Sequence, residues 1–317
     1  MSRPRMVLLG ACLAAALAAG CSATGGATGA AEGDELRVVA TTTQVADFAR
    51  NVGGDQVQVT SLLKPGVDAH DFEPSPTDLD TIARADLVLE NGVGLEGWLD
   101  DTIKSSGFTG PVVDTSQGVK LRNGGHAEEG QEQAGGGEEH DPHIWQNPRN
   151  AQIMAANIQR ALSEAEPAGA ATFKANLDTY TKQLQALDVE VERQIDSLAN
   201  KKLVTNHDAF GYYIDRYGLE FVGSVIPSFD TSTELSGKDV RDLVARIKAT
   251  KVKAVFSETT LPPKAAQTIA AEGGVKVVTG EDALYGDALG PPGSDGDTYL
   301  KMVRHNTATI VSNLSGT

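Results

Sequence analysis

The sequence is short of cysteine, of basic side chains and of long apolar runs. Its two cysteines are Cys12 and Cys21, so residues 22–317 contain no thiol for a disulfide bond or a thiolate metal site. The apolar run at residues 7–17 is shorter than the roughly 18 residues that a membrane-spanning helix needs. Neither the zinc-protease pattern HExxH nor the nucleophile elbow GxSxG is present. Stability must therefore come from apolar cores, which 317 residues can build as two domains.

Acidic residues outnumber basic ones along the whole chain. There are 27 Lys and Arg against 43 Asp and Glu, a formal net charge of −16. If Arg3 and Arg5 are removed with a leader, 25 basic residues remain and the formal charge becomes −18. An acidic surface repels phosphate backbones, so we expect no nucleic-acid partner.

The amino terminus has the pattern of an export signal. Arg3 and Arg5 precede the apolar run, and small residues lead from it to Cys21. Residues 17–21, Leu-Ala-Ala-Gly-Cys, resemble a bacterial lipobox, in which the cysteine is acylated and starts the mature chain. An ordinary signal peptide with a coincidental cysteine is the alternative. We predict a signal peptide at 1–20, a lipid-anchored flexible tether at 21–35, and an extracytoplasmic protein anchored to the cell membrane through Cys21.

Short β-branched runs alternate with helical stretches, which is typical of an α/β fold. The first half has four expected strands, and so does the second. They are residues 36–41, 57–63, 86–90, 111–114, 203–206, 220–226, 254–257 and 275–279. We therefore predict two lobes, each with a small, mostly parallel sheet flanked by helices.

An unbroken apolar stripe separates the two groups of strands. Its members recur at steps of three or four residues: Phe173, Leu177, Tyr180, Leu184, Leu187, Val191, Ile195 and Leu198. This periodicity predicts one rigid helix over 170–200, roughly 45 Å long, that packs along both lobes, with a coiled-coil seam as the alternative. The predicted domains are an N-terminal lobe at 36–165, a linker helix at 166–200 and a C-terminal lobe at 201–317.

One segment, residues 122–140, is low in complexity. It is rich in Gly and Glu and has too few apolar residues to order itself, so we expect a mobile acidic surface loop. His126 and His140 lie within it.

Three of the six histidines occur where an expected strand meets a loop. His70 follows the second strand, His143 directly precedes a helix, and His207 closes the strand at 203–206. Loops at strand ends carry the ligands of open α/β sheets. No two of the three stand at a local chelating interval, so spacing alone does not identify a site.

The residues around these histidines resemble the zinc and manganese receptors of ABC importers. The resemblance runs in order over most of the chain and includes residues 70–79, 85–88, 91–92, 95–99, 141–145, 206–212, 285–289, 296–299 and 302–306. It implies a metal bound in the cleft between two lobes, and a permease with its ATPase as partners. A monomer is expected.

The family's metal ligands correspond to His70, His143, His207 and Asp287. Three imidazoles and one carboxylate favour Zn²⁺, with Mn²⁺ as the alternative, because manganese prefers oxygen-rich sites. Three neighbouring carboxylates could accept hydrogen bonds from the ligand imidazoles: Asp68, Asp71 and Glu258. Zinc receptors of this family often carry a His-rich acidic loop before the second ligand, so His126 and His140 are candidates for weak metal capture.

Three other functions compete with a metal receptor. Residues 92–97 match the dinucleotide pattern GxGxxG, but an exported protein rarely meets soluble NAD. A zinc-dependent hydrolase would need an open coordination position, which Asp287 as fourth ligand closes. Surface receptors of this family have also been called adhesins, so cell adhesion is a further alternative.

Since a long helix limits hinge motion, we expect metal release through local rearrangement around Asp287.

Overall fold

The computed structural model describes residues 35–123 and 140–315. The first lobe is built on a four-stranded parallel sheet of order β2-β1-β3-β4. Its strands are β1 (Leu36–Ala40), β2 (Val57–Ser61), β3 (Leu87–Glu90) and β4 (Val112–Asp114). Its helices are α1 (Thr43–Gly53), α2 (Pro76–Ala83), α3 (Leu99–Ser106) and α4 (Pro148–Ala165).

Neighbouring residues of β1 serve two different cores. Val38 and Ala40 belong to the main core, which also takes in α1, α4 and α5. Val39 lies on the opposite face, in a smaller core with Ile82 of α2. A parallel strand with helices on both faces is apolar where both faces are covered, and this explains the apolar run Val38–Ala40 in β1.

The second lobe has two pairs of parallel strands, β5 with β6 and β7 with β8, and β5 also contacts β7. These strands are β5 (Lys202–His207), β6 (Glu220–Ile226), β7 (Ala254–Phe256) and β8 (Lys276–Val278). The accompanying helices are α6 (Gly211–Tyr217), α7 (Gly237–Thr250) and α8 (Lys264–Gly273). All eight strands expected from the sequence are therefore present, with ends that differ by at most two residues.

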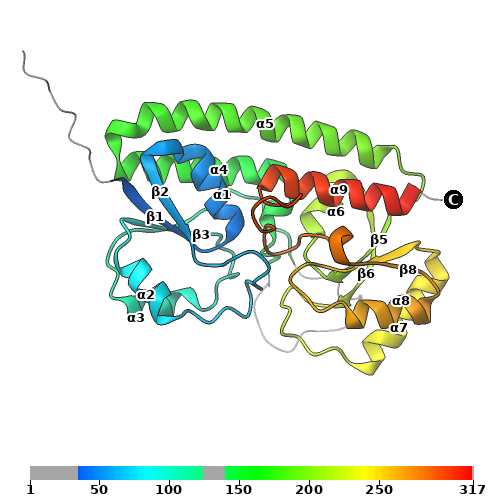
Figure 1. Cartoon of the computed structure of the whole chain (residues 1–317). Helices are drawn as coiled ribbons and strands as arrows, with labels where there is room; N and C mark the ends of the chain where they lie inside the picture. The colour runs from blue at the N-terminus through cyan, green and yellow to red at the C-terminus, as the bar shows by residue number, and fades with distance from the viewer. Residues whose placement is uncertain (1–34, 124–139, 316–317) are drawn as a thin grey trace, which may run out of the picture. The chain divides into compact units, whose positions relative to one another are not determined.

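The predicted long helix is α5 (Ala170–Asp196), and it runs along both lobes (Figure 1). It packs against α1 and α4 and also against α6 and α9 (Tyr299–Ser315). The prediction of a helix that packs along both lobes is therefore confirmed, in preference to the alternative of a coiled-coil seam. Its end differs from the prediction by four residues. The N–H groups of Ser197 and Leu198 donate to carbonyls three residues back, which tightens the last turn and directs the chain into β5.

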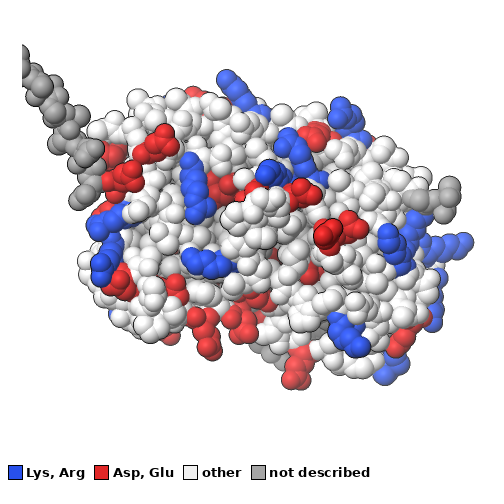
Figure 2. Space-filling view, in the orientation of Figure 1, with Lys and Arg blue, Asp and Glu red and all other residues white. Residues whose placement is uncertain are grey.

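The surface charges contribute little to this architecture. On the face drawn in Figure 2, basic and acidic side chains are interspersed. Several form exposed ion pairs, such as Arg84 with Asp80 at 2.9 Å. Exposed pairs of this kind stabilise a fold by at most about 1 kcal/mol each. Stability rests on the apolar cores instead.

Candidate metal centre

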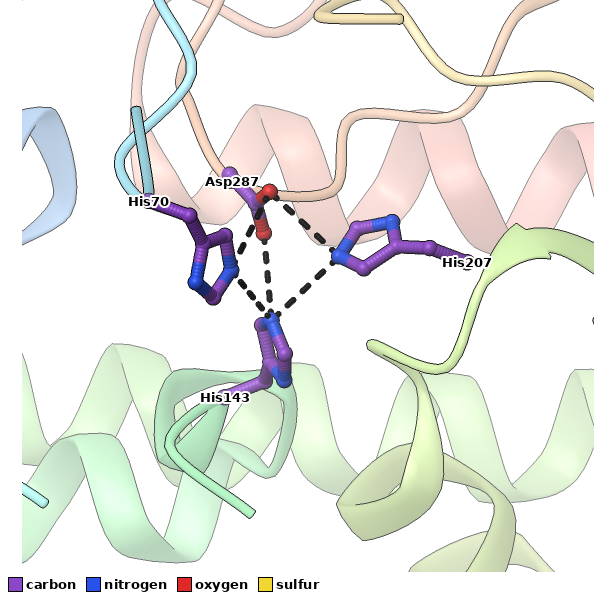
Figure 3. A group of neighbouring side chains, drawn as sticks. All are labelled: His70, His143, His207 and Asp287. Carbon is purple, nitrogen blue, oxygen red and sulfur yellow. Dashed lines mark hydrogen bonds and ion pairs between the residues drawn. The ribbon is translucent and has the colours of Figure 1, made fainter. Parts of the chain in front are cut away.

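Four side chains from both lobes meet at the carboxyl ends of the strands (Figure 3). His70 follows β2, His143 precedes α4, His207 is the last residue of β5, and Asp287 follows β8. One ligand atom of each lies within 4.8 Å of the others. The structure thus brings together all four residues that the family resemblance indicated.

The same local turn orients two of the three imidazoles. In Asp68-Ala69-His70, the Asp68 carboxylate accepts the backbone N–H of His70 at 2.9 Å. In Asp141-Pro142-His143, the Asp141 carboxylate accepts the backbone N–H of His143 at 3.0 Å. An aspartate that bonds the backbone two residues on stabilises a turn without any other secondary structure. Each histidine is therefore fixed by its own loop.

The spacing of the ligand atoms fits a tetrahedral metal site. Nε2 of His143 lies 3.3 Å from Nε2 of His70 and 3.3 Å from Nε2 of His207. The carboxylate of Asp287 lies 3.4 Å from Nε2 of His143 and 3.3 Å from Nε2 of His207. Zinc–nitrogen bonds of roughly 2.0–2.1 Å at tetrahedral angles place two nitrogens about 3.3–3.4 Å apart. Four of the six separations are therefore those of a tetrahedral zinc shell, while Nε2 of His70 lies farther from Asp287, at 3.8 Å.

Two carboxylates select the tautomers of two imidazoles. Asp141 lies 2.8 Å from Nδ1 of His143, and Glu258 lies 2.9 Å from Nδ1 of His207. A carboxylate beside Nδ1 holds the ring proton there, which leaves the lone pair on Nε2. In both rings Nε2 is the atom that points toward the other ligands (Figure 3). The lone pairs of these two nitrogens therefore converge on one point, where they could coordinate a metal cation.

The carboxylate of Asp287 is buried among the imidazoles and has no hydrogen-bond donor for either oxygen within the described residues. Burial would raise its pKa, but the three imidazoles hold the pKa of Asp287 far below its usual value. Burial lowers the pKa of His70. Burial also opposes charge on His207, but the Glu258 and Asp287 carboxylates raise the pKa of His207 well above 6.5. A buried, ionised carboxylate needs positive charge beside it, which a protonated imidazole or a metal ion among the same imidazoles would supply.

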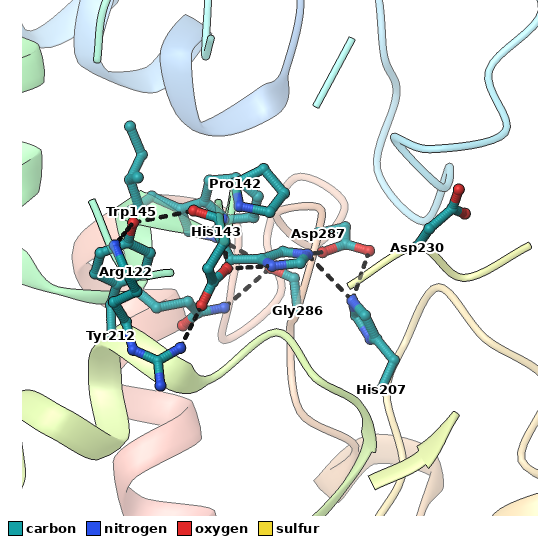
Figure 4. Close-up of polar contacts among 12 residues, drawn as sticks. Arg122, Pro142, His143, Trp145, His207, Tyr212, Asp230, Gly286 and Asp287 are labelled. Carbon is teal, nitrogen blue, oxygen red and sulfur yellow. Dashed lines mark hydrogen bonds and ion pairs between the residues drawn. The ribbon is translucent and has the colours of Figure 1, made fainter. Parts of the chain in front are cut away.

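Arg122 supports the site from behind Asp141 (Figure 4). Its guanidinium donates to the second carboxylate oxygen of Asp141 at 2.8 Å and to Asp215 at 2.6 Å. Gly211 leaves the space for it, since a Cβ at that position would lie 1.7 Å from Nη1 of Arg122. Asp141 is thus held by Arg122 on one side and holds His143 on the other.

The segment around Asp287 is tied to the first lobe. The carbonyl of Gly286 accepts Nε1–H of Trp145 at 3.1 Å and the Gln146 amide at 3.3 Å. The N–H of Leu289 donates to Oγ1 of Thr43 at 2.8 Å. A Cβ at residue 286 would lie 2.1 Å from the Glu258 carboxylate, so a larger residue there would displace the group beside His207. These contacts fix the position of Asp287 from both sides.

The structure places the residues that we predicted around the ligands in different ways. Glu258 lies beside His207 as expected. Asp68 bonds the backbone of His70 and not its ring, and its other oxygen accepts the hydroxyl of Thr231. Asp71 is exposed, and within the described residues no hydrogen bond joins it to a ligand imidazole. His126 and Cys21 lie outside the described residues. His140 pairs with Asn123 in an isolated β-bridge and is not part of the four-residue group.

Sequence reasoning missed Asp141, the carboxylate that holds His143. The signal was present, since Asp-x-His occurs at both 68–70 and 141–143. Sequence reasoning also included Arg122 in the expected mobile loop, whereas its side chain is mostly buried and paired with Asp141. The charge partners of Arg122 come from distant positions in the sequence, so the local composition wrongly predicted that Arg122 belongs to the mobile loop.

The glycine-rich turn at 92–97 does not offer a phosphate site. Glu96 is buried, and its carboxylate accepts the N–H groups of Asn91 at 2.7 Å and Gly92 at 3.2 Å. Burial raises the pKa of Glu96 to about 7. The turn amides that a pyrophosphate would need are therefore already occupied by a side chain. Gly92 and Gly94 have φ angles of 86° and 76°, which explains the glycines by backbone conformation.

Zinc affinity should decrease as the pH falls from about 8 to 6.5. Because the pKa of His207 is raised well above 6.5, its imidazole in the metal-free protein holds a proton to a higher pH than an ordinary histidine, and zinc must displace that proton. One displaced proton costs roughly tenfold in affinity per pH unit. Asp287, with its depressed pKa, stays ionised throughout and adds no slope. Competition titration at several pH values measures the slope, and Glu258→Gln should move it to lower pH. A constant affinity between pH 8 and 6.5 would contradict this account of His207.

Comparison with known proteins adds an independent line of evidence. The family model described as "Zinc-uptake complex component A periplasmic" matches residues 38–313. The manganese-binding lipoprotein MntA of Bacillus subtilis (strain 168) is 34% identical over 285 residues, covering 88% of this chain and 90% of the relative. The iron ABC transporter substrate-binding lipoprotein MtsA of Streptococcus pyogenes serotype M1 is 30% identical over 295 residues, covering 90% of each.

The fold also matches solved structures. The periplasmic zinc-binding protein TroA from Treponema pallidum superposes with a TM-score of 0.79 at 29% identity. The match covers 89% of this chain and 100% of that chain. The two-lobed α/β architecture with its long helix is therefore that of these binding proteins.

Proposed function

Because the chain belongs to the family of the periplasmic zinc-uptake component A, we propose that it is an extracytoplasmic receptor for a divalent transition metal. In this proposal it delivers the metal to an ABC importer made of a permease and an ATPase. The metal is cargo, and His70, His143, His207 and Asp287 are its ligands. The observation that carries the proposal is this closed group of three imidazoles and one otherwise unpaired carboxylate.

A receptor explains the closure of the site better than an enzyme does. The side chains of His143, His207 and Asp287 are 0% exposed, and that of His70 is 8% exposed. Hydrolytic zinc needs an open position for water, whereas four protein ligands fill a tetrahedral shell. Members of the matched family are substrate-binding components of transporters and not enzymes. The relatives are named for metal binding and transport, so the adhesion alternative finds no support.

Zinc is the cargo that we propose. Three imidazole nitrogens and one carboxylate suit zinc, and zinc lies above manganese and iron(II) in the usual order of affinities. Both oxygens of Asp287 face imidazoles, at 3.4 Å from His143 and 3.3 Å from His207. A two-oxygen contact would enlarge the shell and admit manganese, which remains the alternative cargo. The relatives bear the names of manganese and iron binders and the structural neighbour that of a zinc binder.

The proposed location is the outer face of the cell membrane, with Cys21 as the lipid anchor and the receptor as a monomer. The relatives MntA and MtsA are lipoproteins by name. Cys21 and the tether at 21–35 lie almost wholly outside the described residues. Among the residues that the structure describes, no helix is long and apolar enough to cross a membrane.

Purified protein should bind one zinc ion per chain and prefer it to manganese by a large factor. Competition between the two metals, with metal content measured after dialysis against a chelator, tests both parts. Zinc-loaded protein should hydrolyse no ester or phosphate substrate. A chain that keeps no divalent metal would refute the receptor, and a preference for manganese would change only the cargo.

A further inference from the structure

The four proposed ligands are not held equally well. Asp141 and Glu258 support the rings of His143 and His207, and the segment of Asp287 is bonded on both sides to the first lobe. His70 differs from them. Within the described residues no side chain bonds its Nδ1, and it is the only one of the four with an exposed side-chain fraction above zero. Its loop, residues 62–75, contains no helix or strand.

The His70 loop is anchored by backbone hydrogen bonds of Leu62 and Leu63 to Ala40 and Thr41 and by the ring of Phe72 against Trp98. Nearer to His70, two side-chain contacts hold it. Nε1–H of Trp98 donates to the carbonyl of Ala69 at 3.2 Å, which ties the loop to the first lobe. Asp68 supplies the other contact. Its Oδ1 accepts the backbone N–H of His70, and its Oδ2 accepts the hydroxyl of Thr231 at 2.7 Å. Because Thr231 belongs to the second lobe, one carboxylate connects a ligand of the first lobe to a segment of the second.

Thr231 lies in residues 227–236, which join β6 to α7 and which we call the roof segment. The roof segment contains no helix or strand, and it covers the site with Phe229, whose buried ring lies 6.2 Å from the ring of His143. Inside it, Asp230 accepts the backbone N–H of Ser232 at 2.8 Å. Asp230 lies beyond His207 and Asp287 in Figure 4. The roof segment is bonded to the second lobe through the carbonyl of Ser228, which accepts the N–H of Asp208 at 3.2 Å, and to the His70 loop through Thr231.

We propose that Asp68 and Thr231 are positioning residues that control how fast the metal enters and leaves. Their hydrogen bond holds the roof segment against the His70 loop, so that His70 stays on the metal and water stays out. When the bond opens, His70 is the ligand that leaves first, because no side chain among the described residues bonds its Nδ1. This inference rests on the proposed receptor function, and it replaces the expected rearrangement around Asp287, whose segment is bonded on both sides.

The test is zinc release from loaded full-length protein into excess chelator, followed by stopped flow. Thr231→Val removes the hydroxyl and keeps the shape, and it should release zinc about tenfold faster, as expected for one hydrogen bond to a charged acceptor. Thr231→Ser restores the hydroxyl and should release at nearly the wild-type rate. Thr233→Val is the matched control, since Thr233 is exposed in the same segment, and it should change nothing.

Two further readouts separate this role from a structural one. Association should accelerate together with release in Thr231→Val, so that the equilibrium affinity changes much less than the release rate. The backbone N–H of His70 should exchange faster with deuterium, because its acceptor Asp68 loses its second bond. If Thr231→Val does not fold, Thr231→Ala takes its place.

Wild-type release from folded Thr231→Val would overturn the inference, as would equal acceleration in Thr233→Val. A lower affinity with unchanged association would also overturn it, since that describes a damaged site. None of these outcomes would contradict the proposed receptor function, which is contradicted only if the wild-type chain binds no metal.

Discussion

Replacing His143 with alanine should weaken zinc binding by more than about a hundredfold. Structural zinc sites bind with roughly 10–16 kcal/mol, so an equal share for each of four ligands is about 3 kcal/mol. His143 has more than an equal share, because its Nε2 lies within 3.4 Å of an atom of each other ligand. Competition with a chelator of known affinity measures the loss.

His140→Ala is the matched control for the loss of one imidazole. His140 is near in sequence but lies in an isolated β-bridge outside the four-residue group, so tight binding should be unchanged. Circular dichroism shows whether each variant is folded. A folded His143→Ala protein with wild-type affinity would remove His143 from the site and, with it, the proposed ligand set.

Replacing Asp141 with asparagine should cost roughly 10–100-fold in zinc affinity, the range usual for a residue that supports a ligand imidazole. The neutral amide no longer fixes the proton on Nδ1 of His143, so the lone pair on Nε2 is no longer guaranteed. The variant should also be less stable, because Arg122 loses a fully buried charge partner at 2.8 Å.

Asp215→Asn provides the comparison for Asp141→Asn. Asp215 bonds the same guanidinium at 2.6 Å, but its side chain is 58% exposed and does not touch His143. Its loss should change the free energy of unfolding by at most about 1 kcal/mol and leave zinc affinity unchanged. Equal affinity losses in both variants would mean that Arg122, and not Asp141, supports the site.

The strands and the long helix were predictable because each has a local cause. Eight short β-branched runs gave the eight strands, and an apolar stripe from Phe173 to Leu198 gave α5. The end of α5 was not predictable, because Leu198 continues the stripe and is buried although the helix has already ended at Asp196. Periodicity reports which side chains are buried, and a tight turn can bury the next one equally well.

The sequence by itself determined the fold class, and its family resemblance indicated the four residues that the structure brings together. It could do so because strands are local features, and the family motifs are continuous segments of chain. Only the tertiary structure decided which side chains support these residues. Asp141 with Arg122, Glu258 with Gly286, and Asp68 with Thr231 are partners because loops from separate strands converge, and Asp68 and Thr231 are 163 residues apart. A sequence pattern records what each loop contains, whereas the packing of the two lobes determines which of those groups meet.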